Sequence, residues 1–219
     1  MVRPHQPSDP EGSVPRARGR GVLLALVVGV AATAGFLIWQ PGALLSATQA
    51  VSERATIGGP FRLASSKGGD LSDGDLKGKP FAIFFGFTRC PEVCPTTLWD
   101  MSESLHRLGA QAQDLTVVFV SLDPERDTPQ TLASYIQSFD PRIIGLSGPP
   151  AQIAALAKAY RVFWRKVPTS DGDYTLDHTA VVYLMDRQGH YAGIIGYKED
   201  EAARDEKLRQ LLAMPGAAG

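Results

Sequence analysis

Cysteine is scarce in this chain, with only 2 among 219 residues. Cys90 and Cys94 lie so close together that a bond between them would close a very short loop, and disulfide stabilisation falls as the loop shortens. The pair therefore cannot staple the domain, and a structural zinc site, which needs four closed ligands, is disfavoured. The fold must be held by a hydrophobic core, which a body of about 150 residues is long enough to bury.

A strong net charge is also missing. The chain has 22 basic and 23 acidic residues, a formal net charge of −1, so no global field draws it to polyanions. The body contains no basic stripe with interleaved aromatic residues, and nucleic-acid binding is therefore not expected. No internal repeat or second domain is visible, and 44% hydrophobic with 21% charged residues is typical of one globular domain.

Only one long apolar run occurs, at residues 21–39. A helix of that length reaches about 30 Å, the thickness of the hydrocarbon core of a bilayer. Residues 1–20 are rich in Pro, Gly, Ser and Arg, and are predicted to be a disordered cytoplasmic tail. Arginines end this tail and Trp39 ends the run, which predicts a single-pass membrane anchor with the soluble domain on the extracytoplasmic, periplasmic side.

A cleaved signal peptide is the alternative, because small residues around Ala50 could form a cleavage site. The apolar run is longer than the usual signal core of about 7–15 residues, which favours an uncleaved anchor. A lipid anchor on a processed cysteine is not expected, since no cysteine lies between the run and Cys90.

Strands and helices alternate in the pattern of the remaining chain. Buried strands are predicted at 80–87, 115–122, 143–146 and 179–185, an antiparallel partner at 191–197, and helices at 95–108, 129–139, 151–160 and 200–212. Shorter strands are predicted at 61–63, 162–167 and 174–176. The alternation predicts an α/β, thioredoxin-like fold with a central mixed sheet flanked by helices. This domain is expected at residues 59–213, after a linker at 40–58 and before a flexible tail at 214–219.

The two cysteines lie where a buried strand is followed by a helix. In α/β sheets, sites gather at this carboxyl end of a strand. Cys94 is expected at the helix N-terminus, where free backbone N–H groups and the positive end of the dipole stabilise a thiolate. Thiol-disulfide exchange is one interpretation. The usual exchange motif has two intervening residues, however, and the third one here opens the pair so that both sulfurs can approach a single ion.

A histidine far along the chain completes a possible ligand set. His178 immediately precedes the predicted strand at 179–185, and in a thioredoxin-like fold the start of this strand lies beside the cysteine loop. Two soft sulfurs and one nitrogen suit Cu(I), and they can also hold Cu(II). The other histidines, His5, His106 and His190, have no comparable placement.

Three segments together resemble the Sco/SenC family of copper-binding cytochrome c oxidase assembly proteins: FFGFTRCPEVCPTTL at 84–98, VSLDPERDTP at 120–129 and YTLDHTAVVYLMDRQG at 174–189. The similarity runs through most of residues 55–212. It implies that Cys90, Cys94 and His178 are copper ligands. It also implies a metallochaperone, rather than an enzyme, that delivers copper to the binuclear copper centre of cytochrome c oxidase subunit II.

In some members the resemblance instead implies a thiol-disulfide oxidoreductase that reduces the cysteines of that copper centre, or a redox sensor. Another copper chaperone or a thiol-disulfide reductase would then be further partners. A binding module that uses only the thioredoxin-like surface is a third hypothesis, in which the cysteines are dispensable.

Two acidic residues have open roles. The family's acidic loop motif carries onto Asp123, Pro124, Arg126, Asp127 and Pro129. Asp123 could orient a ligand or face the partner, or it could cap a helix or start a turn. Asp177 could be the outer partner of the His178 ring or a turn residue. Arg126 is expected to pair with a nearby acid.

Overall fold

The structure, a computed structural model, describes residues 57–216. The elements in chain order are β1 (Arg62–Ser65), β2 (Asp70–Ser72), α3 (Asp73–Leu76), β3 (Phe81–Gly86), α4 (Val93–Leu108), the 3₁₀ turn η1 (Gly109–Ala112), β4 (Thr116–Ser121), α5 (Pro129–Ile136), β5 (Ile143–Ser147), α6 (Pro150–Ala159), β6 (Trp164–Pro168), β7 (Tyr174–His178), β8 (Val181–Met185), β9 (Tyr191–Gly196) and α7 (Glu201–Ala213). This order confirms the predicted alternation of strands and helices.

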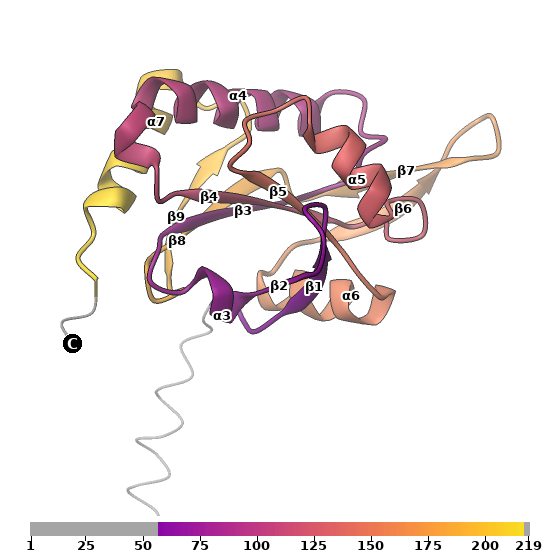
Figure 1. Cartoon of the computed structure of the whole chain (residues 1–219). Coiled ribbons are helices and arrows are strands. Elements are labelled where there is room, and N and C mark those ends of the chain that lie inside the picture. The colour runs from indigo at the N-terminus through magenta and orange to yellow at the C-terminus, as the bar shows by residue number, and fades with distance from the viewer. Residues whose placement is uncertain (1–56, 217–219) are drawn as a thin grey trace, which may run out of the picture. The chain divides into compact units, whose positions relative to one another are not determined.

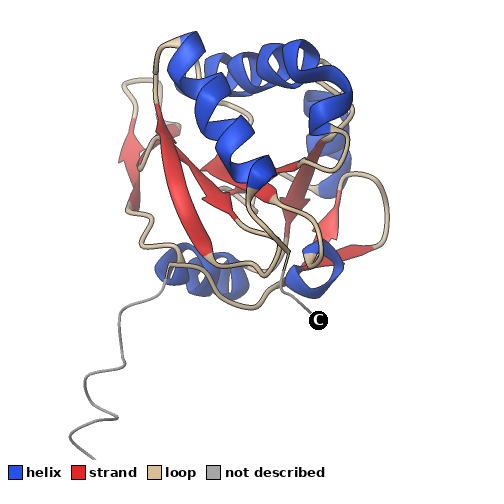
Figure 2. Cartoon of the chain, turned by 90° about the vertical axis from the view of Figure 1, so that its left-hand side faces the viewer, coloured by secondary structure: helices blue, strands red, loops and turns tan. Residues whose placement is uncertain are grey.

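Seven strands form one mixed sheet in the order β2-β1-β5-β4-β3-β8-β9. The central strands β3, β4 and β5 are parallel, and β1, β8 and β9 join antiparallel on either side. Figure 1 shows α4 and α5 over one face of this sheet and α6 over the other, and Figure 2 shows the two helical layers from the side. The arrangement is the predicted thioredoxin-like α/β fold with a mixed sheet.

The core lies on both faces of β3 and β4. Every residue of β3 is buried, as expected for a continuous apolar run in a parallel sheet. Phe84 packs against Phe119 of β4 under α4 and α5, with ring centroids 5.9 Å apart. Phe85 faces the other side, where its ring lies 5.3 Å from that of Tyr160. Full burial of such a side chain stabilises the fold by about 1.5–3 kcal/mol, so these strands are a rigid base for the loops at their carboxyl ends.

Several element boundaries differ from the sequence prediction. Helix α4 begins at Val93 rather than at residue 95, so Cys94 lies inside its first turn. The short helix α3 has no counterpart among the predicted helices, and it forms because Ser72 and Asp75 make a capping box. His178 was expected just before a strand, but it is the last residue of β7 and pairs with Trp164 of β6, and β8 begins only at Val181.

No helix within residues 57–216 is both long and apolar enough to cross a membrane. The predicted tail at 1–20 and anchor at 21–39 lie outside the described residues, as does most of the predicted linker. The tail, the anchor and the linker therefore remain predictions from the sequence.

Candidate metal site

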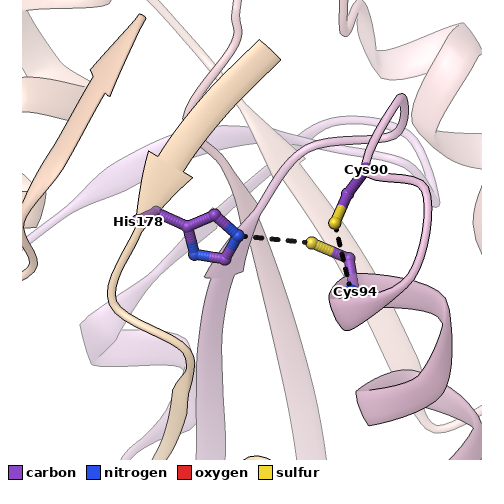
Figure 3. A group of neighbouring side chains, drawn as sticks. All are labelled: Cys90, Cys94 and His178. Atoms are coloured by element: carbon purple, nitrogen blue, oxygen red, sulfur yellow. Dashed lines mark hydrogen bonds between the residues drawn. The ribbon is translucent and has the colours of Figure 1, made fainter. Parts of the chain in front are cut away.

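The two cysteines and the histidine meet at the carboxyl end of β3. Cys90 lies in the loop after β3, Cys94 in the first turn of α4 and His178 at the end of β7 (Figure 3). Their sulfur and nitrogen atoms all lie within 4.8 Å of one another, and Cys94 Sγ is 3.6 Å from His178 Nε2. An ion held at about 2.0–2.3 Å by three such atoms needs them about 3.5–4 Å apart in a trigonal plane. The group therefore has nearly the dimensions of a three-ligand site.

The helix N-terminus stabilises the thiolate of Cys90, not that of Cys94 as the sequence suggested. The N-cap residue Glu92 provides no side-chain cap, and the backbone N–H of Cys94 donates to Cys90 Sγ at 3.3 Å instead. The hydrogen bond from the Cys94 thiol is the main cause that lowers the pKa of Cys90 to about 4, against its partial burial, and the backbone N–H groups of Cys94 and Glu92 add to the effect. Cys90 is thus a half-buried thiolate at neutral pH.

Cys94 has the opposite chemistry because its side chain is completely buried. Burial raises the pKa of the Cys94 thiol, and the neighbouring Cys90 sulfur raises it further. The pair therefore holds one proton, on Cys94, and metal binding must release it because a thiolate is the ligand.

This difference predicts unequal reactivity of the two cysteines. A thiol-alkylating reagent such as iodoacetamide is expected to modify Cys90 at a rate that is nearly constant between about pH 6 and pH 9, because Cys90 is already a thiolate throughout that range. Cys94 should react only after unfolding. Mass spectrometry of the alkylated peptides measures both rates, and a Cys90 rate that rises tenfold per pH unit would contradict the assignment.

The ring of His178 is oriented for metal binding. Its Nδ1 lies 3.0 Å from the backbone carbonyl oxygen of Thr179, and because a carbonyl only accepts, Nδ1 carries the proton. The lone pair of Nε2 then faces Cys94 Sγ. The rings of Phe84 and Phe87 lie edge-on to the imidazole at 6.1 and 6.0 Å, which fixes its plane from the side of the core.

Two further residues shape the site: Gly86, which no sequence prediction singled out, and Asp127, which was predicted only as part of the acidic loop motif. A Cβ at Gly86 would lie 2.6 Å from Cys94 Sγ and 2.7 Å from the Phe119 ring, so only glycine leaves room for the sulfur. A glycine inside a buried apolar strand was the available signal for such a close approach. The buried carboxylate of Asp127 accepts bonds from the Thr88 backbone N–H at 2.9 Å and from Ser121 Oγ at 2.6 Å. Asp127 thereby anchors the chain two residues before Cys90.

The two acids with open roles lie differently. Asp123 is 1% exposed; its carboxylate accepts from Arg126 and from the Tyr174 hydroxyl, and its carbonyl accepts from the following turn. A role of Asp123 toward a ligand or a partner stays a prediction. Arg126 thus pairs with an acid, as expected.

Asp177 pairs with Arg165 across the hairpin at 2.7 Å, while the Thr179 carbonyl orients the His178 ring. Asp177 is exposed, and its role toward a partner stays a prediction.

Comparison with known proteins gives a consistent result. The family model SCO1/SenC matches residues 49–213. Among curated proteins, the mitochondrial SCO1 homolog 1 of Arabidopsis thaliana is 38% identical over 67% of this chain, and the human mitochondrial SCO1 homolog is 38% identical over 64%. These matches cover 44% and 48% of the two relatives, so the chain spans less than half of their length. Among solved structures, Bradyrhizobium japonicum ScoI with copper bound is 50% identical, with a TM-score of 0.66 over 71% of this chain and 99% of that one.

Proposed function

The chain belongs to the SCO1/SenC family, and on that premise we propose that it is a copper metallochaperone with Cys90, Cys94 and His178 as its copper ligands. One observation carries the proposal: two sulfur atoms and one imidazole nitrogen, from three separate segments, lie within 4.8 Å of one another. Soft thiolates with one imidazole select Cu(I), and the same set can hold Cu(II). The likeness to ScoI of Bradyrhizobium japonicum, a structure with copper bound, supports the choice of copper over other metals.

The different environments of the three ligands suit transfer by ligand exchange. Cys94 is completely buried, whereas Cys90 and His178 are half-buried and lie at the outer side of the group. An acceptor thiolate can therefore approach the ion from solvent and replace the outer ligands first. Each exchange keeps the copper bound by at least two donors, and the proton taken up by Cys94 at the end favours release.

The proposed acceptor is the binuclear copper centre of cytochrome c oxidase subunit II. We also propose that residues 21–39 anchor the domain to the membrane in which the oxidase is assembled, with residues 59–213 on the extracytoplasmic side. That compartment is oxidising, so Cys90 and Cys94 would need a thiol-disulfide reductase before copper loading. A second copper chaperone would supply the metal.

The test separates copper delivery from thiol-disulfide exchange. In cells that lack this chain, the wild type is expected to restore oxidase activity and the copper content of subunit II, whereas His178→Ala is not. The reason is that the His178→Ala protein loses tight copper binding but keeps a dithiol that can still be oxidised. Oxidase activity, metal analysis of subunit II and the redox state of the cysteine pair are measured together.

The double variant with serine at positions 90 and 94 is the control that should fail under both functions. If His178→Ala restored the oxidase fully, thiol reduction would replace copper delivery as the function. If the purified, reduced wild-type chain took up no Cu(I), the metallochaperone proposal would be wrong. If the double serine variant restored oxidase activity, neither copper binding by the cysteines nor thiol-disulfide exchange would be the function.

A further inference from the structure

The strand that carries His178 is not part of the main sheet. Among the described strands, β6 and β7 form a separate two-stranded sheet, and β7 ends at His178. A two-stranded hairpin is at best marginally stable alone. The position of the imidazole over the cysteine pair therefore depends on what attaches this hairpin to the body.

Arg126 makes the most buried polar attachment. Its guanidinium, with 13% of the side chain exposed, donates through Nε to the buried Asp123. Through Nη1 it donates to Asp173 Oδ1 and to the backbone carbonyl of Tyr174, both at 3.0 Å. Asp123 and Arg126 belong to the loop after β4, whereas Asp173 and Tyr174 belong to the hairpin. One side chain thus joins the body to the first residue of β7.

Tyr174 makes the attachment directional. Arg126 Cζ lies 3.7 Å from the centre of the Tyr174 ring, and the Tyr174 hydroxyl donates to Asp123 Oδ1 at 2.7 Å. The ring is therefore held by its face and by its tip. Side chains alternate along a strand, so those of residues 174, 176 and 178 share one face of β7. Holding Tyr174 aims His178 toward the body as well.

The other hairpin attachments are weaker or less specific. Two ion pairs also reach the hairpin, Lys166 of β6 with Glu125 at 2.6 Å and Arg89 with Asp173 at 3.0 Å. All four side chains are exposed, and pairs of this kind contribute little. Leu176 is buried against the core, but apolar burial is non-directional and does not fix where along its axis the strand lies. A planar guanidinium with several donors in a rigid fork does fix it.

We propose that Arg126, held by Asp123 and stacked on Tyr174, is a positioning residue that keeps the His178 imidazole over Cys90 and Cys94 for copper binding. This inference rests on the proposed function, because it assumes that His178 is a copper ligand. Arg126 touches neither sulfur nor the imidazole, and acts only through the hairpin.

A double-mutant cycle on the full chain tests the inference. Cu(I) affinity is measured by competition with a chromophoric Cu(I) chelator for the wild type, Arg126→Gln, His178→Ala and the double variant. Arg126→Gln is expected to weaken Cu(I) binding about tenfold, the lower end of the loss seen when groups that orient metal ligands are removed. In the His178→Ala background the same substitution should change affinity less than about twofold, because residues that act through each other are not additive.

Two further variants serve as a control and as a second test of the positioning role. Lys166→Gln is the matched control: it removes a positive charge that also lies over the Tyr174 ring, 4.4 Å from its centre, but that belongs to an exposed pair, so affinity is expected to stay at the wild-type value. Tyr174→Phe keeps the ring but loses the hydroxyl. It should lower Cu(I) affinity less than Arg126→Gln does, and again only when His178 is present. This variant replaces Arg126→Gln in the test if Arg126→Gln does not fold. In Cu(II)-loaded Arg126→Gln, the imidazole nitrogen coupling in the electron paramagnetic resonance spectrum should weaken.

The outcomes are distinguishable. If Arg126→Gln lowered affinity equally with and without His178, or did not lower it at all, the positioning role would be wrong while the ligand set stood. If His178→Ala alone left the affinity unchanged, the ligand set itself would be wrong, and the positioning role with it.

Discussion

Replacing Cys94 by serine is expected to lower Cu(I) affinity by about a thousandfold, equivalent to about 4 kcal/mol. Cys94 is the innermost of the three proposed ligands, with its sulfur 3.6 Å from His178 Nε2 and no exposed surface. A serine oxygen is a hard donor, and it lies nearer to its own backbone than a sulfur does, so it neither suits Cu(I) nor reaches the centre of the group. Competition with a chromophoric Cu(I) chelator measures the loss.

The free energy of unfolding without metal should change far less than the copper affinity, because serine is close in size to cysteine. Thermal unfolding of the metal-free variant gives that comparison. Ser104→Ala is a suitable control, since Ser104 is a completely buried α4 residue that binds Arg204 at 2.8 Å, far from the cysteines. It should lower stability and leave copper affinity unchanged. Wild-type affinity in Cys94→Ser would remove Cys94 from the ligand set.

The fold was predictable where one strand or helix carries its own signal. The runs that became β3 and β4 are apolar at nearly every position, which is what burial on both faces requires. The convergence of Cys90, Cys94 and His178 was also expected, because the carboxyl end of β3 and the end of the late hairpin region lie together in this fold. The predicted helix start at residue 129 is confirmed: Pro129 is the first residue of α5, and the Thr128 hydroxyl caps the helix by accepting from the Thr131 backbone N–H.

Features that depend on two distant segments were not predictable in the same way. The sequence predicts one strand that begins at residue 179. In the structure, the Thr179 backbone N–H donates to the Phe163 carbonyl and the Thr179 hydroxyl accepts from the Phe163 backbone N–H, and these two bonds separate β7 from β8. The choice of Cys90 as the thiolate required the burial of Cys94 and the exact start of α4. Pairwise contacts such as Arg126 with Tyr174 join residues 48 apart, and no local pattern predicts them.

Gly86→Ala is the substitution that most directly tests how the core shapes the site. The added methyl group would lie 2.6 Å from Cys94 Sγ and 2.7 Å from the Phe119 ring, and the buried strand gives it nowhere else to go. Overpacking of this kind costs about 1–3 kcal/mol of stability. The sulfur must also move away from the strand, and we expect Cu(I) affinity to fall about a hundredfold, or about 3 kcal/mol. Chelator competition and thermal unfolding measure the two effects.

Gly148→Ala separates the loss of copper binding from general overpacking. A Cβ at Gly148 would also meet a neighbour at 2.6 Å, but that neighbour is Leu63 on β1, away from the ligands. Gly148→Ala should therefore lose stability and keep its copper affinity, whereas Gly86→Ala should lose both. Equal copper affinities in the two variants would mean that the position of Cys94 Sγ does not limit binding. The shape of β3 would then matter for folding alone, and the three-ligand geometry would be looser than the contacts around Gly86 imply.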